Sequence, residues 1–466
     1  MAVGVGAVLV VVLLVAVAIR ARHGFRLAVV SIVVFAGLAG VSPARVAAAS
    51  GATLFVQQFN NNTVNSAYPV SVPALPSGAS GSNSACLTAS GNTTTGPLLS
   101  CTSSNDTQGS GKLRFTSASA GLEGGVFSAT SVPTSEGVDA TFNSYQYGGT
   151  GADGLAFVLA AVNPADPLSP ANIGQSGGAL GYSAEAGSSL VGLADAYMGI
   201  GLDVYGNFSN SAYEGTGCTN PAYISTSGHT VPGQVVVRGP GNGLAGYCAI
   251  NSTAKNTSSK ALTLRASTRS ASEVPVEVAI NPTSVSFTTA SGITVPAGTY
   301  AVQFTPVGGS ATTLTGTLPT VSSGLYPSSW VNSAGIPSQL AFGWVASTGA
   351  STDFHEIDSA NVVTFAPVPQ LTVTQTAYSA ASPSAGAPVT YTITPGVSSS
   401  GTSESDPVSV TQTLPAGVKP VGAYGSGWTC GAPSGQTITC TDSATPFAAG
   451  SSLPAITVEG IVTGSG

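Results

Sequence analysis

Short segments rich in Val, Thr, Ile and Tyr, separated by glycine and proline, dominate the sequence after residue 50. They include VDATFNSYQY (138–147), GLAFVLAAV (154–162), YMGIGLDVYG (197–206), KALTLRAS (260–267), TYAVQFTP (299–306) and QLAFGWVAS (339–347). Long amphipathic helical patterns are missing from this part, and segments of this composition favour strands. The number of strands predicts an all-β fold, in which residues 50–365 form a two-sheet antiparallel jelly-roll sandwich.

The residue pattern changes after the stretch APVPQ, which we interpret as a linker over residues 366–370. Beyond it, apolar residues alternate at Val389, Tyr391 and Ile393, and GWTCGAPSGQTITCT (427–441) has the pattern of a hairpin. The sequence therefore predicts a second, small Ig-like β-sandwich over residues 371–466.

The first 49 residues have the pattern of a targeting region. Residues 2–19 are apolar, the basic segment RARHGFR follows, and a second apolar run (27–41) leads to small residues around Ala47 and Ala49. The second half alone has the three parts of a signal peptide. We expect export, with cleavage near Ala49 and a secreted or surface-displayed product. The first apolar run has no basic residue before it, so either the true start lies downstream, near Arg20, or both runs form a membrane hairpin with the basic segment inside.

Six cysteines in an exported chain predict disulfides. Proximity in the sequence favours the pairs Cys86–Cys101, Cys218–Cys248 and Cys430–Cys440. The formal net charge of −7 argues against a nucleic-acid partner, because such a partner requires a basic face. It is compatible with a cation site.

The stretch GIGLDVYGNFS (199–209) places oxygen donors on one side of a strand end. With a period of two, Gly201, Asp203, Tyr205 and Asn207 share a face. A carboxylate, an amide oxygen and a backbone carbonyl between them suit Ca²⁺. Glu214 is the one acid in the loop that follows, and we expect it to supply the remaining ligand. The alternative is a polar strand end with ordinary Asx turns.

Four motifs in order resemble the legume-lectin-like (L-type lectin) family over roughly residues 55–365, and bacterial secreted members in particular. They are GADGLAFVL, GQSGGALGY, GIGLDVYGNF and STDFHEIDSANVVTF. The resemblance implies that the protein binds glycans without catalysis.

The resemblance also implies roles for individual residues. Asp153, preceded by a cis peptide bond from Ala152, would accept hydrogen bonds from sugar hydroxyls. Gly178 would donate its backbone N–H to the sugar. Asp203, Asn207 and the Tyr205 carbonyl would hold one Ca²⁺, and Asn207 would also contact the sugar.

The chain departs from the family at one position. Plant members carry a glutamate two residues before the calcium aspartate, where it binds a transition metal, and Gly201 stands there instead. A transition-metal site is therefore not expected. The cluster His355, Glu356 and Asp358 is interpreted as structural, and His229 as a solvated loop residue. Aromatic residues that could stack on a sugar are Tyr205, Phe208, Tyr213, Tyr223 and Tyr247.

The segment 370–466 resembles a repeat module of unknown function found in tandem on bacterial surface proteins. The residues that carry this are APVTYTITP, SVTQTLPAG and the late cysteine pair. The resemblance implies a spacer and an association with the cell envelope.

Two alternatives to a lectin remain open. One is a structural surface protein or adhesin that keeps the fold without binding sugar. The other is a glycoside hydrolase on the same type of sandwich, which would need two carboxylates about 5–10 Å apart. The sequence has no ExDxxE run to supply them.

Overall fold

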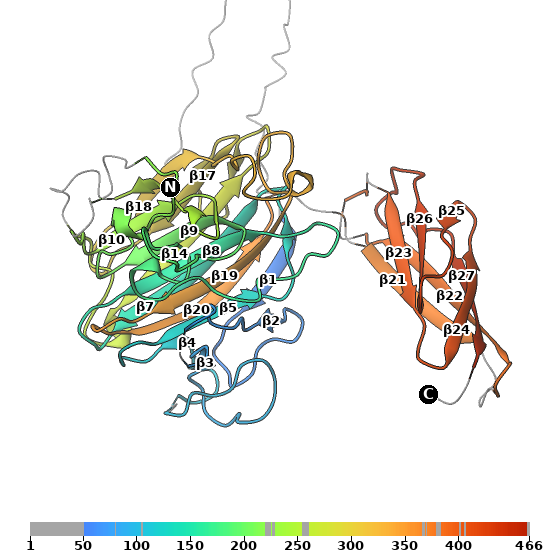
Figure 1. Ribbon diagram of the computed structural model, residues 1–466, viewed down its shortest axis with the longest axis horizontal. Helices are drawn as coiled ribbons and strands as arrows, with labels where there is room; N and C mark the ends of the chain where they lie inside the picture. Colours follow the sequence, from blue (N-terminus) through green and yellow to red (C-terminus); the bar gives the residue numbers. More distant parts are fainter. Residues whose placement is uncertain are drawn as a thin grey trace, which may run out of the picture. The chain divides into compact units, whose positions relative to one another are not determined.

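The structure is a computed structural model (Figure 1). It describes residues 51–463 except 80, 104–105, 220–224, 226–228, 254–260, 366–368, 370, 379–383, 400–401 and 405–406. The predicted targeting region and most of the predicted linker lie outside the described residues, as does Tyr223. Within the described part, no helix has the length and apolar character needed to cross a membrane.

Two large antiparallel sheets form the first sandwich, as predicted. The eight-stranded sheet has the order β18 (Thr312–Thr317), β17 (Thr299–Phe304), β14 (Glu273–Asn281), β7 (Val138–Tyr147), β20 (Phe354–Val363), β4 (Leu113–Thr116) and β3 (Cys86–Leu87), with β1 (Thr53–Gln57) paired to β20. The ten-stranded sheet has the order β12 (Ala245–Gly246), β11 (Gly241–Asn242), β9 (Ala196–Asp203), β8 (Gly154–Ala161), β19 (Gln339–Ser347), β5 (Glu123–Ser128) and β2 (Val70–Ser71), with β10 (Gln234–Arg238), β13 (Ala249–Ser252) and β6 (Val132–Pro133) paired alongside.

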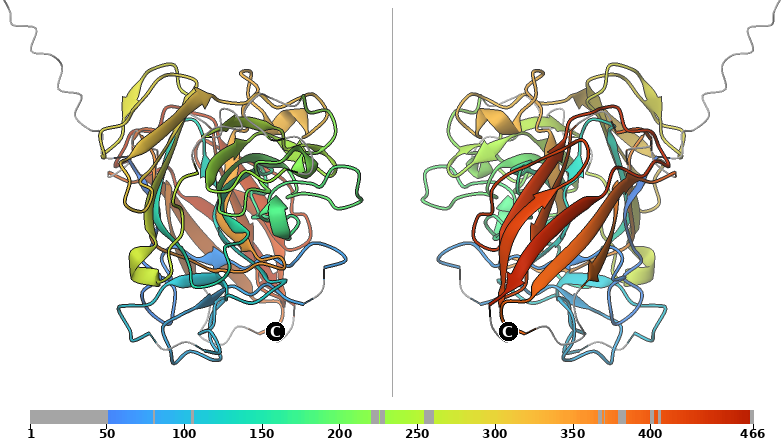
Figure 2. Two further views of the ribbon diagram at one scale, coloured as in Figure 1. Left: turned by 90° about the vertical axis from the view of Figure 1, so that its left-hand side faces the viewer. Right: turned by 90° about the vertical axis from the view of Figure 1, so that its right-hand side faces the viewer.

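Alternation of side chains creates the core between these sheets. On β14 and β9 every second residue is apolar and faces inward. On β7 Val138, Ala140 and Phe142 do so, and the series continues with the buried polar residues Ser144 and Gln146. Phe142 of β7 meets two rings of the other sheet, with ring centroids 5.9 Å from Phe157 and 5.7 Å from Trp344. In Figure 2, β14 (yellow-green) and β9 (green) lie in opposite layers.

A second core covers the outer face of the ten-stranded sheet. There the other faces of β8 and β9 pack against loops that contribute Leu180, Tyr182, Phe208 and Tyr247, all fully buried. The loops include the short 3-10 helices η1 (Gly177–Ala179) and η2 (Ser211–Tyr213). Because the sheet is covered on both sides, β8 and β9 are buried along their whole length.

Smaller elements complete this sandwich. They are the hairpin of β15 (Phe287–Thr288) and β16 (Thr294–Val295), and the 3-10 helices η3 (Arg269–Ala271) and η4 (Ser328–Trp330). The prediction of a strand over residues 260–267 is wrong for its described part, which has a single bridge from Ala266 to Tyr147. The backbone hydrogen bonds of this part go to three different segments, at Gly233, Gln146 and Val307, so no continuous ladder forms.

The C-terminal part forms the predicted small β-sandwich. Its four-stranded sheet has the order β21 (Leu371–Tyr378), β22 (Pro388–Val397), β27 (Ile456–Val462) and β24 (Val418–Tyr424), and its three-stranded sheet the order β23 (Val408–Thr413), β26 (Thr437–Asp442) and β25 (Trp428–Cys430). Ile393, Ile438 and Ile456 share its core. The expected hairpin is present, with Cys430 directly opposite Cys440.

Three disulfides join Cys86 to Cys101, Cys218 to Cys248 and Cys430 to Cys440. These are the pairs that proximity in the sequence favours.

Candidate functional site

Asp153 lies immediately before β8 and is only 4% exposed. Its N–H donates to the Ser347 carbonyl (2.9 Å), and its own carbonyl accepts from the Tyr205 N–H (3.0 Å). The Ala152–Asp153 peptide bond is cis, as the resemblance implied. Its carboxylate Oδ2 has no hydrogen-bond partner among the described residues. Because an unpaired buried oxygen is costly, this atom is a natural acceptor for a ligand hydroxyl or a cation.

Asp203 ends β9, and its partner in the neighbouring strand is Gly154. The two strands are antiparallel, so Asp153 and Asp203 come to the same end of the sheet. The Asp203 Oδ1 accepts from the Gly206 N–H (2.8 Å), and its Oδ2 accepts from both the N–H and the hydroxyl of Ser209 (2.8 Å each). The carboxylate therefore shapes the loop that carries Tyr205 and Asn207.

Two carboxylates so close together repel each other. Burial raises the pKa of Asp153 to about 7, and the charge of Asp203 adds to the rise, whereas a backbone hydrogen bond from Gly349 opposes it. Burial raises the pKa of Asp203 to about 6, although hydrogen bonds from its loop lower it. Neither acid takes part in any of the six ion pairs among the described residues. A proton, a cation or a hydroxyl donor would each relieve this repulsion.

The η1 turn brings Gly178 against the loop after β9. The Ser347 hydroxyl donates to the Gly177 carbonyl (2.8 Å) and fixes the turn over the sheet. A Cβ atom at Gly178 would lie 2.3 Å from Cβ of Asn207 and 2.6 Å from Cζ of Tyr213. Only glycine allows this approach, so the residue type at 178 determines how closely the two loops meet.

The aromatic residues proposed to stack on a sugar divide into two groups. Phe208 and Tyr247 are fully buried in the second core, so they cannot contact a ligand. Tyr205 is 39% exposed. Tyr213 is partly buried near the acids. Burial raises its pKa, and the charges of Glu185, Asp153 and Asp203 raise it further. The structure thus groups the predicted residues Asp153, Gly178, Asp203, Tyr205, Asn207 and Tyr213, and it adds Ser347 and Gly349.

The prediction for Glu214 needs correction, because its carboxylate is engaged elsewhere. Its Oε1 accepts from the Ala249 N–H (2.8 Å) and lies 3.9 Å from Nη1 of Arg238. Arg238 is fully buried and also donates to the carbonyls of Phe208 and Asn210. Since a guanidinium beside a carboxylate opposes cation binding, Glu214 has a structural role in this geometry.

Gly201 leaves space for an aromatic ring. A Cβ atom there would lie 2.3 Å from Cδ1 of Phe208. The position at which plant lectins carry a metal-binding glutamate therefore faces an apolar side chain in this protein.

The cluster near the C-terminal end of the sandwich consists of structural contacts. Glu356 pairs with Arg114 (Nε to Oε1, 2.8 Å) and with Arg269, and Asp358 pairs with Lys112. His355 is fully buried, with its Nδ1 2.7 Å from the Thr116 hydroxyl. By contrast, the predicted loop residue His229 is exposed.

Asp353 and Arg265 support the loop that carries Asp153. Arg265 donates to both carboxylate oxygens of Asp353, at 2.6 and 2.7 Å, and to the Gly149 carbonyl at 3.0 Å. Asp353 in turn accepts from the Gly149 N–H (2.9 Å). Asp353 lies in the motif STDFHEIDSANVVTF, but its pairing with Arg265 was not predicted, because the two residues are 88 positions apart in the chain.

The residues proposed to hold calcium offer only oxygen atoms as ligands. No group of three or more His, Cys, Asp or Glu side chains that could hold a metal is found within the described ranges. Asp203, the Asn207 side chain, the Tyr205 carbonyl and water are the donors that remain after Glu214 is removed. Their chemistry suits a hard cation, and the unpaired Oδ2 of Asp153 beside Asp203 is the feature of this structure that such a charge would satisfy.

Comparison with solved structures finds lectins among the matches. Peanut lectin with a nine-residue peptide has 18% sequence identity and a TM-score of 0.33, over 63% of this chain and 95% of that chain. The Ca²⁺-bound exoplasmic/lumenal domain of VIP36 has 12% identity and a TM-score of 0.33, over 67% and 89%. Lectin I-B4 from Griffonia simplicifolia in its metal-free form has 14% identity and a TM-score of 0.32, over 63% and 98%.

No family model matches the sequence, and no curated protein matches it. Likenesses at these identities and TM-scores do not establish a family.

Proposed function

We propose that this protein is a lectin that binds a glycan at the common end of β8 and β9, without catalysis. The observation that carries the proposal is the buried Asp153 carboxylate, whose Oδ2 has no partner and which lies beside a second carboxylate. A sugar hydroxyl would donate to this oxygen and satisfy it. Charge-assisted hydrogen bonds of this kind are worth about 1.5–3 kcal/mol each.

The surrounding residues fit the recognition of a polyol. Gly178 and Asn207 flank the acid through the close approach of their two loops, and Tyr205 offers an exposed ring beside them. Backbone N–H groups, an amide, a carboxylate and an aromatic surface are the groups that orient a small polar ligand. In this arrangement Asp153 accepts, whereas Gly178 and Asn207 donate.

We propose that one Ca²⁺ accompanies the sugar, held by Asp203, Asn207 and the Tyr205 carbonyl. When bound, the ion supplies a fixed positive charge beside the two carboxylates. Asp203 orients the loop through Gly206 and Ser209, and this hydrogen bonding keeps Asn207 against Gly178.

A glycan array probed with the purified chain, with and without chelator, tests this function. We expect binding to a limited set of glycans, reduced by chelator. An array without any binding in the presence of Ca²⁺ would favour the structural surface protein. Release of reducing sugar from a glycan bound on the array would instead favour the hydrolase.

We also propose that the protein is exported and acts at the cell surface, with the C-terminal sandwich as a spacer. The three disulfides support this, because such bonds persist in oxidising compartments. Intact-mass analysis of protein from the medium is expected to give a chain that starts near Ser50. Detection of the uncleaved N-terminus in that fraction would contradict cleavage.

A further inference from the structure

A second pair of acids lies on the outer face of the eight-stranded sheet. Asp139 of β7 and Glu277 of β14 are diagonal neighbours, because Asp139 pairs with Ala279 and Glu277 pairs with Thr141. Glu277 also pairs with Gln303 of β17. Side chains related in this way share a face and come within reach of each other. The two carboxyl groups are close enough to share a hydrogen bond.

Both acids are more than nine-tenths buried, at 5% and 7% exposure. Asp139 Oδ1 and Glu277 Oε1 have no hydrogen-bond partner among the described residues. Neither acid belongs to the six ion pairs, in which each described arginine of the first sandwich is engaged with another carboxylate. Buried carboxylates are normally paired with a cation or coordinate a metal, and this pair lacks a basic neighbour.

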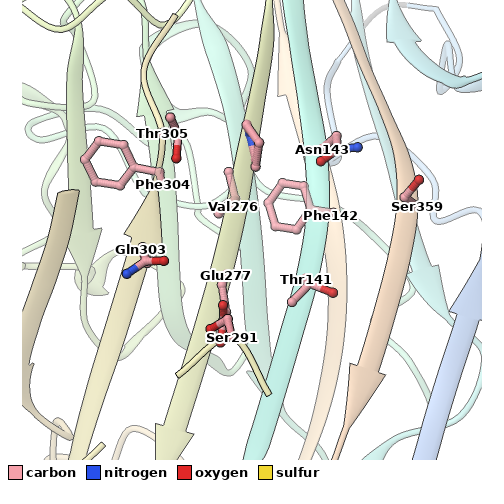
Figure 3. Close-up of a pocket in the computed structure, with 11 residues that line it drawn as sticks. Thr141, Phe142, Asn143, Val276, Glu277, Ser291, Gln303, Phe304, Thr305 and Ser359 are labelled. Atoms are coloured by element: carbon pink, nitrogen blue, oxygen red, sulfur yellow. The ribbon is translucent and has the colours of Figure 1, made fainter. Parts of the chain in front are cut away.

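A cavity of about 380 Å³ is lined by Glu277, one member of this pair. Thr141, Glu277, Ser291 and Gln303 line it with polar atoms. Figure 3 shows Glu277 between Gln303 and Thr141, with Ser291 beside it. The cavity thus offers oxygen donors around an unpaired carboxylate, and it has room for water molecules.

The hairpin of β15 and β16 packs near the pair, because Val295 of β16 shares a cluster with Ala279, the residue opposite Asp139. Ala279, Val295, Ala301 and Phe365 form a small apolar cluster there. Burial, and then the charge of Glu277, raises the pKa of Asp139 to about 8. Near neutral pH the pair therefore keeps a proton, and a divalent cation could displace it.

We propose that Asp139 and Glu277 form a binding site for a hard divalent cation such as Ca²⁺ or Mg²⁺. The hydroxyls of Thr141 and Ser291 and water from the cavity complete its oxygen shell. Donors made of oxygen alone suit these ions, and Mg²⁺ in particular is often held by one or two carboxylates and several waters. The ion joins β7, β14 and the β15–β16 hairpin, and it is independent of the proposed glycan site.

Cation stoichiometry measured on the full chain tests this assignment. The chelator-treated protein is titrated with CaCl₂ and, separately, with MgCl₂ in a calorimeter at pH 7.5. The variants are Asp139→Asn and Glu277→Gln, which preserve shape, with Glu273→Gln as an exposed acid on the same strand for control. We expect at least tenfold weaker binding at one site in the first two variants and unchanged binding in the third.

The Asp203→Asn variant separates this site from the proposed calcium of the glycan site. Cation binding that persists in Asp203→Asn and is lost on adding Glu277→Gln supports the inference, even if the glycan proposal fails. Complete loss of cation binding in Asp203→Asn overturns the inference. A Glu277→Gln variant with unchanged cation stoichiometry also overturns the inference, because the two acids would then share a proton and bind no cation. Should the Glu277 and Asp139 variants not fold, the titration of Asp203→Asn alone decides.

Discussion

Asp353 and Asp153 are both buried acids at the same end of the first sandwich, yet their surroundings differ. Asp353 receives two hydrogen bonds from Arg265 and one from the Gly149 backbone. Asp153 has an oxygen without a partner and a like charge beside it. In a chain with only 7% charged residues, an acid held by arginine indicates a structural contact. An acid left unpaired indicates a place for a ligand.

The largest effect should come from breaking the structural pair. Arg265→Ala leaves the fully buried Asp353 without its cation, and removal of one partner from a buried pair costs several kcal/mol. Because Arg265 is 32% exposed, we expect a loss of roughly 3 kcal/mol of unfolding free energy in urea denaturation. Arg265→Lys should recover part of it. A change below about 0.5 kcal/mol would remove the distinction between the two acids.

Substitution of Asp153 should have the opposite effect on stability and raise the free energy of unfolding above neutral pH. Its pKa of about 7 exceeds the usual value of 3.8, so the folded protein keeps a proton that the unfolded chain loses between about pH 4 and pH 7. The contribution of Asp153 to stability is therefore present below pH 4 and is lost as pH rises toward 7.

In chelator, Asp153→Asn should match the wild type near pH 4 and become more stable by a few kcal/mol at pH 8, on the order set by the pKa shift. Comparison with the variant isolates Asp153 from other titrating groups such as His355, whose pKa is lowered to about 4 by burial. Parallel stability curves for the two proteins between pH 4 and pH 8 would refute the raised pKa.

A steric change should separate the two loops of the site. Gly178→Ala places a methyl group against Asn207 and Tyr213, and we expect a loss of about 1–3 kcal/mol with weakened glycan binding. Gly422→Ala is the control, since its Cβ would meet nothing within 4 Å. Equal melting temperatures and equal glycan affinities for the two variants would contradict the close approach of the loops.

The smallest effect on stability is expected at Tyr205. Tyr205→Ala removes a ring that is 39% exposed, so its unfolding free energy should change by less than about 0.5 kcal/mol. Glycan affinity should nevertheless fall several-fold if the ring stacks on the sugar. Calorimetry with the array ligand decides this, and an unchanged affinity would remove Tyr205 from the site.

Strand periodicity predicted the fold well because alternation is a local property. The segments 138–147, 154–161 and 339–347 are strands in the structure, and Gly201 lies on the expected face, opposite Ile200 and Leu202. The expected strand face ends early, however, because β9 stops at Asp203 and Tyr205 and Asn207 follow in a loop. The strand predicted over 260–267 is absent from its described part, because the backbone there hydrogen-bonds to several different segments rather than to one neighbouring strand.

The site was predictable only where a motif is compact in the sequence. Asp153, Gly178, Asp203 and Asn207 each stand in such a motif, and the structure groups them. Glu214 was chosen because it is the nearest acid along the chain, but Arg238 takes its carboxylate. Long-range pairs of this kind, including Asp139 with Glu277, leave no local pattern and become visible only when the strands are paired.

The most direct test of the account is the glycan affinity of Asp153→Asn against that of the wild type. Isothermal titration with the glycan identified on the array, in saturating Ca²⁺, measures it. The variant keeps the shape of the side chain but replaces an ionised acceptor with a neutral amide. We predict at least about tenfold weaker glycan binding with little change in calcium affinity. Equal glycan affinities for the two proteins would contradict the claim that the unpaired Asp153 carboxylate is the centre of the binding site.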